Sequence, residues 1–421
     1  MPKQRTTIEL PRGTLDLTYQ TNSHNRNAAY QLNDLLGFAQ RINPKRAFLF
    51  VSKVLGRHIP VAPSTMRTAF TDLAALIPSH LPEPILVIGM AETAVGLSAG
   101  VHQALQTRYP NALLLNSTRH AQHSADAAPN DSACLLTTFS EDHSHASQHL
   151  IYQSADQATQ AQLLASKTLI MVDDEASTGN TCVNVVTALR HAGLSQLAQV
   201  HLTTLVDWSL NQQQATTDTA DAISSRLPDI DFYRHHLLSG AWTWTDAPNP
   251  EPITMPAVDT TEAGSQPLGD TGNWGRFPTL DSTEGFDRYL AHFQTVFTRF
   301  REQISPSLPQ WPARILVLGS NEFVWLPFLL AEWLESQTQT AVNSAATVKF
   351  GALTRSPIAL GGAISTMLSF RDHYGLGMTN FVYNVEPKAW DLIVLCVETA
   401  ADSVDEMWQD LDNVLIVGGK I

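Results

Sequence analysis

The sequence predicts an α/β protein with parallel sheets, and two observations carry this prediction. Residues 85–89, ILVIG, form a short apolar run that is followed by an amphipathic stretch at 92–108 and by a second apolar run at 112–117. Short buried strands that alternate with helices in this way are typical of βαβ units, whose strands are parallel. The same alternation returns at 167–206 and opens again at 315–319, ILVLG, so two such series follow one another.

The chain has 421 residues, which is more than one ordinary core requires and fits two domains of common size. Residues 209–281 are rich in Gln, Thr, Asp, Pro and Gly, apart from one apolar island at 232–244, FYRHHLLSGAWTW. Such a composition is typical of linkers and loops. We therefore expect a first domain at 1–208, a linker and loop region at 209–281, and a C-terminal α/β domain at 282–421.

Three local patterns predict elements outside the two series. Residues 8–19, IELPRGTLDLTY, alternate apolar and polar residues about a Pro-Arg-Gly turn, which indicates a small hairpin. Residues 45–56, KRAFLFVSKVLG, have mixed periodicity, and we expect a helix there. Residues 282–304 predict a helix before the second series.

Composition limits the classes of function. The formal net charge is −14, which argues against a large non-specific nucleic-acid surface because such binding needs many Lys and Arg side chains. No helix-turn-helix pattern points to a DNA-binding regulator. No apolar run has the length of a signal peptide or of a membrane span, so we expect a cytoplasmic protein. The three cysteines are widely separated and cannot build a disulfide framework: Cys134, Cys182 and Cys396.

The strongest functional pattern is LIMVDDEASTGNT at 169–181, in which an apolar strand leads through two acids and a turn of small residues into a helix. Asp173 and Asp174 can accept hydrogen bonds from vicinal ribose hydroxyls and offset positive charge at the anomeric carbon. The next residues can surround a 5′-phosphate with backbone N–H groups, hydroxyls and the positive end of the helix: Ala176, Ser177, Thr178, Gly179, Asn180 and Thr181. The alternative interpretation is a capped βα connection without a ligand.

This segment resembles the signature with which type I phosphoribosyltransferases bind 5-phosphoribosyl-1-pyrophosphate (PRPP). The resemblance implies a phosphoribosyltransferase-type parallel sheet flanked by helices, catalytic roles for Asp173 and Asp174, and Mg²⁺ as cofactor. In purine-salvage members the position of Ser177 holds an aspartate near the purine ring. The hydroxyl found here is closer to orotate phosphoribosyltransferases and disfavours a 6-oxopurine acceptor. The sequence identifies no general base.

In that family a second loop, after an early strand, holds the pyrophosphate, and residues 89–94 stand at the corresponding place. The small residues of this loop suit close approach of the backbone to an anion, and a plain βα turn has the same composition. The expected pyrophosphate contacts are Gly89, Met90, Ala91, Glu92, Thr93 and Arg119.

A mobile basic loop that closes over the reacting bond is expected between residues 117 and 148. Several histidines lie in or next to this stretch: His120, His123, His143, His145 and His149. A zinc site, histidines that face a phosphate, and solvated loop histidines all agree with this composition, so no metal ligand is assigned. Five basic residues precede the sheet, and their composition agrees both with contacts to the acceptor and with a solvated helix face: Lys45, Arg46, Lys53, Arg57 and His58.

The openings of the two βαβ series can be laid on each other without gaps, with ILVIGMAET at 85–93 against ILVLGSNEF at 315–323. Further pairs follow in the same order: Thr118-Arg119 with Thr354-Arg355, Asp142-His143 with Asp372-His373, residues 150–152 with 381–383, and 168–172 with 391–395. This order indicates an internal duplication. The second half has Cys396 and Val397 opposite the two acids, so we expect a degenerate copy that covers the active site or binds the acceptor, with Arg355 as a candidate anion contact.

A more specific resemblance covers most of the chain outside the linker. Thr354-Arg355-Ser356-Pro357 is the motif after which a C-terminal domain of certain phosphoribosyltransferases, the TRSP domain, is named. Residues 43–61 and 139–152 also resemble stretches typical of that family. The resemblance implies a link to bacterial tellurite-resistance and stress gene neighbourhoods, in which a role in making a nucleoside-like metabolite is proposed.

Two functions are compatible with these observations. The first is a Mg²⁺-dependent transferase that uses PRPP, releases pyrophosphate and transfers phosphoribose to an unknown small-molecule acceptor. The second is a non-catalytic PRPP sensor that regulates a partner, because fold does not establish activity. PRPP synthetase also joins two such folds but carries the signature in its second half, unlike this chain. A homodimer agrees with the resemblance, and neither a membrane nor nucleic acid is expected as a partner.

Overall fold

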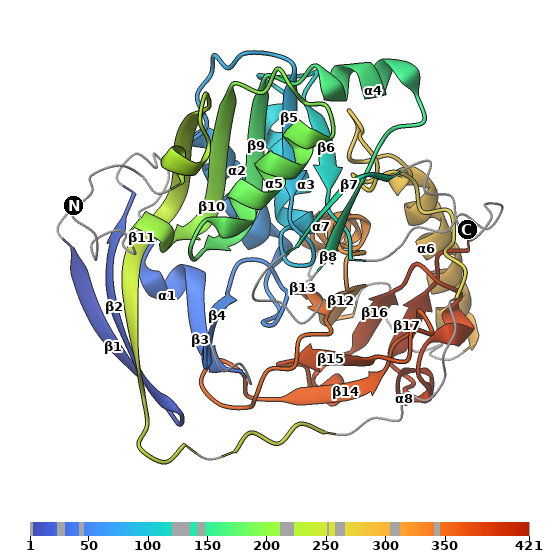
Figure 1. Cartoon of the computed structure of the whole chain (residues 1–421). Coiled ribbons are helices and arrows are strands. Elements are labelled where there is room, and N and C mark those ends of the chain that lie inside the picture. The colour runs from blue at the N-terminus through green and yellow to red at the C-terminus, as the bar shows by residue number, and fades with distance from the viewer. Residues whose placement is uncertain are drawn as a thin grey trace.

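The computed structural model of the chain, shown in Figure 1, describes residues 3–22, 30–41, 46–119, 135–140, 148–210, 223–250, 252–256, 266–303, 312–340 and 346–420. Within these ranges the chain forms two α/β halves, each built on a largely or wholly parallel sheet. The predicted α/β fold class is therefore confirmed. No helix in the described ranges is long and apolar enough to span a membrane.

The first half is built on a seven-stranded sheet of described residues in the order β1-β2-β11-β10-β9-β5-β6. The strands are β1 (Gln4–Leu10), β2 (Gly13–Thr21), β11 (Asp231–Asp246), β10 (Gln199–Asp207), β9 (Thr168–Ala176), β5 (Ile85–Gly89) and β6 (Leu113–Asn116). From β11 to β6 neighbouring strands are parallel, whereas β2 runs antiparallel to β11 and forms the predicted hairpin with β1. Every residue of β5 is buried, as a parallel strand covered on both faces requires.

Helices and smaller sheets surround this layer. The helices are α1 (Leu32–Leu35), α2 (Pro63–Ala75), α3 (Val95–Leu105), α4 (Gln157–Leu164) and α5 (Asn180–His191), with a short turn η3 (Ser224–Arg226). Two antiparallel pairs are formed by β3 (Leu36–Gln40) with β4 (Phe48–Ser52) and by β7 (Leu135–Ser140) with β8 (Gln148–Tyr152). Helices α2 and α3 pack closely because Gly100 leaves room for the Phe70 ring, which would lie 2.1 Å from any Cβ there.

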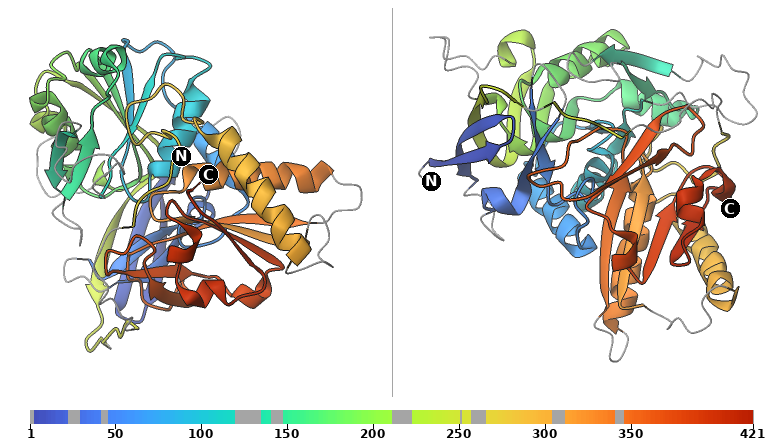
Figure 2. Two further views of the ribbon diagram at one scale, coloured as in Figure 1. Left: turned by 90° about the vertical axis from the view of Figure 1, so that its right-hand side faces the viewer. Right: turned by 90° about the horizontal axis from the view of Figure 1, so that it is seen from below.

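The second half is built on a four-stranded parallel sheet in the order β13-β12-β16-β17 within the described residues. Its elements are α6 (Phe286–Gln303), β12 (Arg314–Ser320), α7 (Trp325–Thr340), β13 (Thr347–Leu353), β14 (Met367–Arg371), β15 (Thr379–Tyr383), η4 (Pro387–Ala389), β16 (Leu392–Cys396), η5 (Ala401–Ser403), α8 (Glu406–Gln409) and β17 (Val414–Val417). Figure 2 shows α2 and α3 between the two sheets, where both helices pack on α7. The helix predicted at 282–304 is confirmed by α6.

The two halves share one topology. The order β6-β5-β9-β10 in the first sheet matches β13-β12-β16-β17 in the second, and each half inserts an antiparallel hairpin after the second strand of its series. The bridge between Thr118 and Leu150 has its counterpart between Thr354 and Phe381, which are the residues that the sequence comparison pairs. The topology thus agrees with the predicted duplication.

The strand pairing corrects one part of the sequence alignment. Ile88 lies opposite Met171 in the first sheet, and Leu318 lies opposite Leu395 in the second. Because Ile88 corresponds to Leu318, Met171 corresponds to Leu395, one position away from the expected match. Asp174 therefore has Glu398 as its counterpart, and the second half retains one of the two acids.

Two further expectations need correction. Residues 48–52 form strand β4 instead of a helix, because the alternating rings of Phe48 and Phe50 pack on Trp242 and Trp208 at centroid distances of 4.9 and 4.7 Å. The apolar island at 232–244 lies in strand β11 of the first sheet, which therefore extends beyond the expected boundary at residue 208. Its pairing with β10 on one side and β2 on the other outweighs the loop-like composition around it.

Candidate functional site

The acids of the strongest sequence motif lie at the carboxyl end of β9. The strand continues through Asp173, Asp174 and Glu175, all of which are partly buried. Burial and the neighbouring charge of Glu175 raise the pKa of Asp174 to about 6. Asp173 accepts a hydrogen bond through Oδ1 from the backbone N–H of Asp174 at 2.9 Å. A bound cation or hydroxyl donors would therefore stabilise the charged form of Asp174.

The residues after these acids form a compact turn that leads into α5. Gly179 has a φ of +75°, and a Cβ at this position would lie 2.1 Å from the side chain of Ile223. Only glycine adopts this conformation here without strain. Thr178 Oγ1 accepts from the backbone N–H of Asn180 at 3.3 Å, and Arg226 donates to Asn180 Oδ1 at 2.6 Å. The N–H groups of the first turn of α5 thus begin directly after this turn, as anion binding requires.

Arg46 joins this turn to the small sheet of β3 and β4. Its guanidinium donates to both carboxylate oxygens of Glu175, at 2.7 and 3.1 Å, and to Ser177 Oγ at 3.1 Å. The guanidinium also lies over the rings of Phe48 and Phe50, 4.9 and 4.7 Å from their centroids. Arg46 was one of five basic residues left open in the sequence, where only its position before the sheet pointed to a role.

The other members of that basic group lie elsewhere. Arg57 is buried and donates to the backbone oxygens of Asn321, Leu353 and Glu92 at 2.6, 3.0 and 2.7 Å. Burial lowers the pKa of Arg57, and burial also lowers the pKa of the neighbouring His58 to about 3. Lys53 donates to a backbone carbonyl at 2.9 Å, and Lys45 is outside the described residues. These contacts give Arg57 a structural place between the two halves.

The loop at 89–94 lies at the carboxyl end of β5, beside the acids. A Cβ at Gly89 would meet Ser98 Oγ at 2.1 Å and Asn116 Oδ1 at 2.4 Å, so this glycine serves close packing of β5 on its neighbours. The backbone N–H groups of Met90 and Ala91 donate to Val172 O and Ser117 Oγ, at 3.4 and 3.0 Å. Among the predicted contacts in this loop, Glu92 and Thr93 are therefore better placed than Met90 or Ala91 to offer backbone N–H groups to an anion.

Arg119 and His149 join this loop to the next strand end. Arg119 donates from Nε to His149 Nε2 at 3.4 Å, and His149 Nδ1 lies 3.0 Å from Ser117 Oγ. His149 is buried and stacks on Phe139 with a centroid distance of 4.7 Å. The four other histidines of this stretch are outside the described residues, so the predicted mobile loop stays a prediction: His120, His123, His143 and His145. Nothing in the sequence favoured His149 over the four other histidines, and its role beside Arg119 is visible only in the fold.

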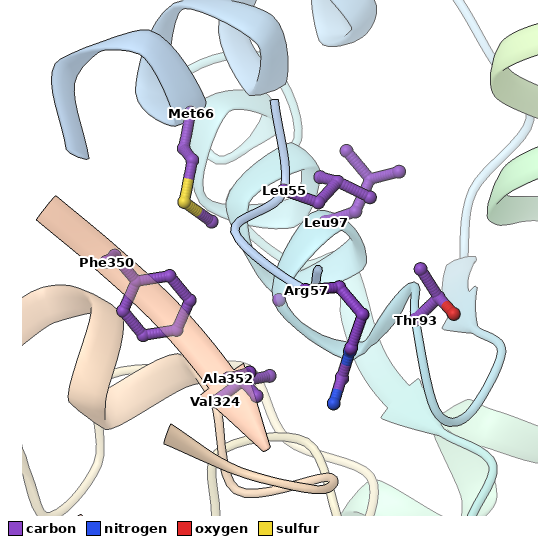
Figure 3. Close-up of a pocket in the computed structure, with 9 residues that line it drawn as sticks. Leu55, Arg57, Met66, Thr93, Leu97, Val324, Phe350 and Ala352 are labelled. Atoms are coloured by element: carbon purple, nitrogen blue, oxygen red, sulfur yellow. The ribbon is translucent and has the colours of Figure 1, made fainter. Parts of the chain in front are cut away.

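A narrow pocket lies behind the 89–94 loop, between the two halves (Figure 3). Its first-half lining includes Arg57 and Thr93, and its second-half lining includes Val324 and Phe350. The side chains in Figure 3 are largely apolar around the Arg57 guanidinium. This pocket belongs to the contact between the halves.

The predicted contact Arg355 follows β13, at the counterpart of Arg119. Its guanidinium lies over the Tyr374 ring, 5.8 Å from the centroid, and it donates to Met378 Sδ at 3.4 Å. Tyr374 in turn donates from its hydroxyl to Glu398 at 2.8 Å, and Glu398 forms an ion pair with Arg276. Arg355 is thus anchored within the second half, and a role in binding an anion stays a prediction.

The strand ends that carry the predicted contacts meet on one edge of the first sheet, because β5, β6 and β9 are parallel neighbours there. Residues 35–234 match the family described as phosphoribosyl transferase, and residues 275–414 match the TRSP domain that lies C-terminal to it. The chain belongs to the TRSP-domain phosphoribosyltransferases. The predicted enzyme class, a pentosyltransferase, is confirmed by this membership. No curated protein matches the chain significantly in sequence.

Solved structures of phosphoribosyltransferases resemble part of the chain. An adenine phosphoribosyl transferase from Trypanosoma brucei, in complex with AMP, pyrophosphate and ribose-5-phosphate, has 13% identity and a TM-score of 0.32 over 55% of this chain and 86% of its own. The adenine phosphoribosyltransferase from Leishmania donovani has 14% identity and a TM-score of 0.32 over 52% and 86%. The Giardia lamblia enzyme complexed with 9-deazaadenine has 12% identity and a TM-score of 0.28 over 48% and 96%.

Proposed function

We propose that this TRSP-domain phosphoribosyltransferase binds PRPP at the edge formed by β5, β6 and β9 and transfers its phosphoribose to a small-molecule acceptor, with release of pyrophosphate. The observation that carries the proposal is the continuous path from the acids at the end of β9, through Gly179 in its left-handed conformation, into the N-terminus of α5. It offers carboxylates for a diol and N–H groups for a phosphate at adjacent positions.

The residues divide the reaction between them. Asp173 and Asp174 accept hydrogen bonds from the ribose hydroxyls, and their charge stabilises the cationic character that develops at C1. Residues 176–181 hold the 5′-phosphate. The 89–94 loop and Arg119 hold the pyrophosphate, whose bond to C1 breaks as the acceptor's nucleophilic atom bonds to the same carbon. Arg46 keeps Glu175 and Ser177 in place through three hydrogen bonds.

Magnesium fits this proposal. Mg²⁺ prefers oxygen ligands and commonly binds through one or two carboxylates together with substrate phosphates. The raised pKa of Asp174 marks a carboxylate whose charged form a cation would stabilise. The described residues hold no group of three His, Cys, Asp or Glu side chains placed to bind a metal ion. When bound, Mg²⁺ supplies positive charge that neutralises the pyrophosphate.

Calorimetric titration of the full chain with PRPP and Mg²⁺ tests the proposal. We expect the Asp173→Asn/Asp174→Asn double variant to lose at least about 100-fold in affinity, since it removes two charged acceptors worth roughly 1.5–3 kcal/mol each. The matched control is Asp287→Asn/Glu302→Gln, which removes two negative charges from exposed positions on α6 and should bind as the wild type does. Folded wild type that binds no PRPP would overturn the proposal.

Acceptor-dependent release of pyrophosphate separates an enzyme from a sensor. A transferase releases pyrophosphate at a rate that rises with the right acceptor, whereas a sensor binds PRPP with no such turnover. Screening nitrogen nucleophiles, including nucleobases and pyrimidine carboxylates, follows once binding is measured. A role in making a nucleoside-like metabolite for stress or tellurite resistance, a cytoplasmic location and a homodimer are the wider parts of this proposal.

A further inference from the structure

One carboxylate of the second half reaches into the pyrophosphate side of the proposed site. Glu322 follows β12, and only 5% of its surface is exposed. One of its oxygens accepts from Thr118 Oγ1 at 2.5 Å, and the other accepts from the backbone N–H of Arg119 at 2.8 Å. Both oxygens of Glu322 therefore accept hydrogen bonds from two residues that follow β6, Thr118 and Arg119.

The opposite contact is also present. Glu92, the first-half counterpart of Glu322, accepts from Thr354 Oγ1 at 3.1 Å, and Thr354 is the counterpart of Thr118. Arg57 lies between the two crossed contacts, donating to Glu92 O and Asn321 O at 2.7 and 2.6 Å. The duplicated halves thus meet through an exchange of equivalent groups, as two copies in a symmetric dimer would.

The two crossed contacts have different consequences. Thr354 precedes Arg355, which is anchored on Tyr374 within the second half. Thr118 precedes Arg119, whose side chain reaches His149 beside the 89–94 loop. Bonds from Glu322 to both the Thr118 side chain and the Arg119 backbone define where this strand end lies. The position of the Arg119 backbone, and with it the direction of the guanidinium, therefore depends on Glu322, a residue of the other half of the chain.

We propose that Glu322 is a positioning residue for Arg119, so that the second half completes the pyrophosphate side of the site and the single chain works as an internal dimer. This inference rests on the proposed function. It predicts a selective effect, because the turn at 176–181 has its own supports in the first half, Arg46 and Arg226. Loss of Glu322 should weaken pyrophosphate binding and spare ribose 5-phosphate binding.

The test measures two ligands separately by calorimetry on the full chain. Ribose 5-phosphate is titrated alone, and inorganic pyrophosphate with Mg²⁺ is titrated at saturating ribose 5-phosphate, so that the 5′-phosphate turn is already occupied. For Glu322→Ala we expect the Kd of pyrophosphate to rise about 10-fold or more, as loss of two buried hydrogen bonds to a carboxylate implies. Glu322→Gln keeps the shape and one acceptor and should give a smaller rise. The Kd of ribose 5-phosphate should stay within about twofold of wild type.

Another interdomain glutamate provides the control. Glu332 on α7 forms an ion pair with Arg67 of the first half at 2.6 Å, away from the strand ends. Glu332→Gln removes a carboxylate from the same contact between the halves and should leave both Kd values unchanged. Thr118→Val, which removes only one of the two bonds to Glu322, should show the selective loss even where Glu322→Ala folds poorly.

The outcomes distinguish this inference from the proposed function. Wild type that binds both ligands, with folded Glu322 variants that bind pyrophosphate equally well, overturns the positioning role alone. Equal losses for both ligands also overturn it, since they indicate that the halves have separated. Wild type that binds neither ligand overturns the proposed function, and the positioning role with it.

Discussion

The carboxyl ends of the two sheets carry equivalent acids in opposite surroundings. Asp174 lies next to Glu175, and burial and that charge raise its pKa to about 6. Its counterpart Glu398 is held by an ion pair with Arg276 and by a hydrogen bond from the Tyr374 hydroxyl at 2.8 Å. Burial, and after it the charge of Glu398, raise the pKa of Tyr374 well above its usual value.

The segments that follow these two acids differ in the length of their helices. In the first half a turn with Gly179 leads into the twelve residues of α5. In the second half the chain passes through the three residues of η5 to the four residues of α8. A helix start that can bind a phosphate is therefore present only in the first of these two segments. The comparison teaches that the acid of the second half is satisfied by side chains of its own half, whereas Asp174 lies beside a second acid and before a full helix.

Exchanging the two acids for amides should give the largest and most contrasting effects. Glu398→Gln breaks a buried ion pair and should lower the free energy of unfolding by about 3 kcal/mol, because Arg276 loses its charged partner. PRPP affinity should stay within about twofold of wild type. Asp174→Asn should do the reverse, with affinity lost and the free energy of unfolding not reduced. Denaturant unfolding and calorimetry measure both quantities, and lost PRPP binding in folded Glu398→Gln would contradict the contrast.

Two glycines on either side of α5 separate an effect on stability from an effect on PRPP binding. Gly179 and Gly193 flank α5 with φ values of +75° and +113°, so an alanine at either position should lower the free energy of unfolding by about 1 kcal/mol. Only Gly179→Ala should also weaken PRPP binding, by about 10-fold, because a Cβ there meets Ile223 and displaces the turn. Calorimetry on both variants checks this, and equal affinities for PRPP would contradict a phosphate-binding turn.

The raised pKa of Asp174 predicts that the free energy of unfolding depends on pH. A carboxyl whose folded pKa is raised to about 6 stabilises the fold below its ordinary pKa near 3.8, and this stabilisation is lost as the pH rises through 6. Asp174→Asn should therefore exceed wild type in unfolding free energy by about 1–2 kcal/mol at pH 8, with the difference vanishing below pH 4. Thermal unfolding across this pH range measures it. A pH-independent difference would place the perturbed group elsewhere.

PRPP affinity should depend on pH in the opposite sense to stability, and should fall as the pH is lowered. Protonation of Asp174 removes a charged acceptor, so the affinity of wild type should decrease as the pH is lowered through about 6. The same titration on Glu398→Gln should show the same midpoint, since the two acids lie in different halves.

The sequence alone determined the α/β class, the order of the parallel strands' apolar runs and the acid-rich turn before α5. These features are local, since a buried strand, two acids, a left-handed glycine and a helix start follow one another within a few residues. The order of short matches also predicted the duplication, with which the shared topology agrees. Local patterns fail where pairing decides. A helix was expected at β4, whose rings pack on two tryptophans, and β11 lies in the stretch assigned to linker and loop but pairs with strands on both sides.

Only the tertiary structure decided which distant groups meet. Glu322 lies more than two hundred positions from Thr118 in sequence, and no local pattern relates one to the other. The sequence alignment misplaced the counterpart of Asp174 by one residue. Two apolar strands look equally similar when one is shifted by a residue, whereas the hydrogen bonds between strands allow only one register. Contacts across the two halves depend on how both sheets pack on α2, α3 and α7, and that packing is a property of the whole chain.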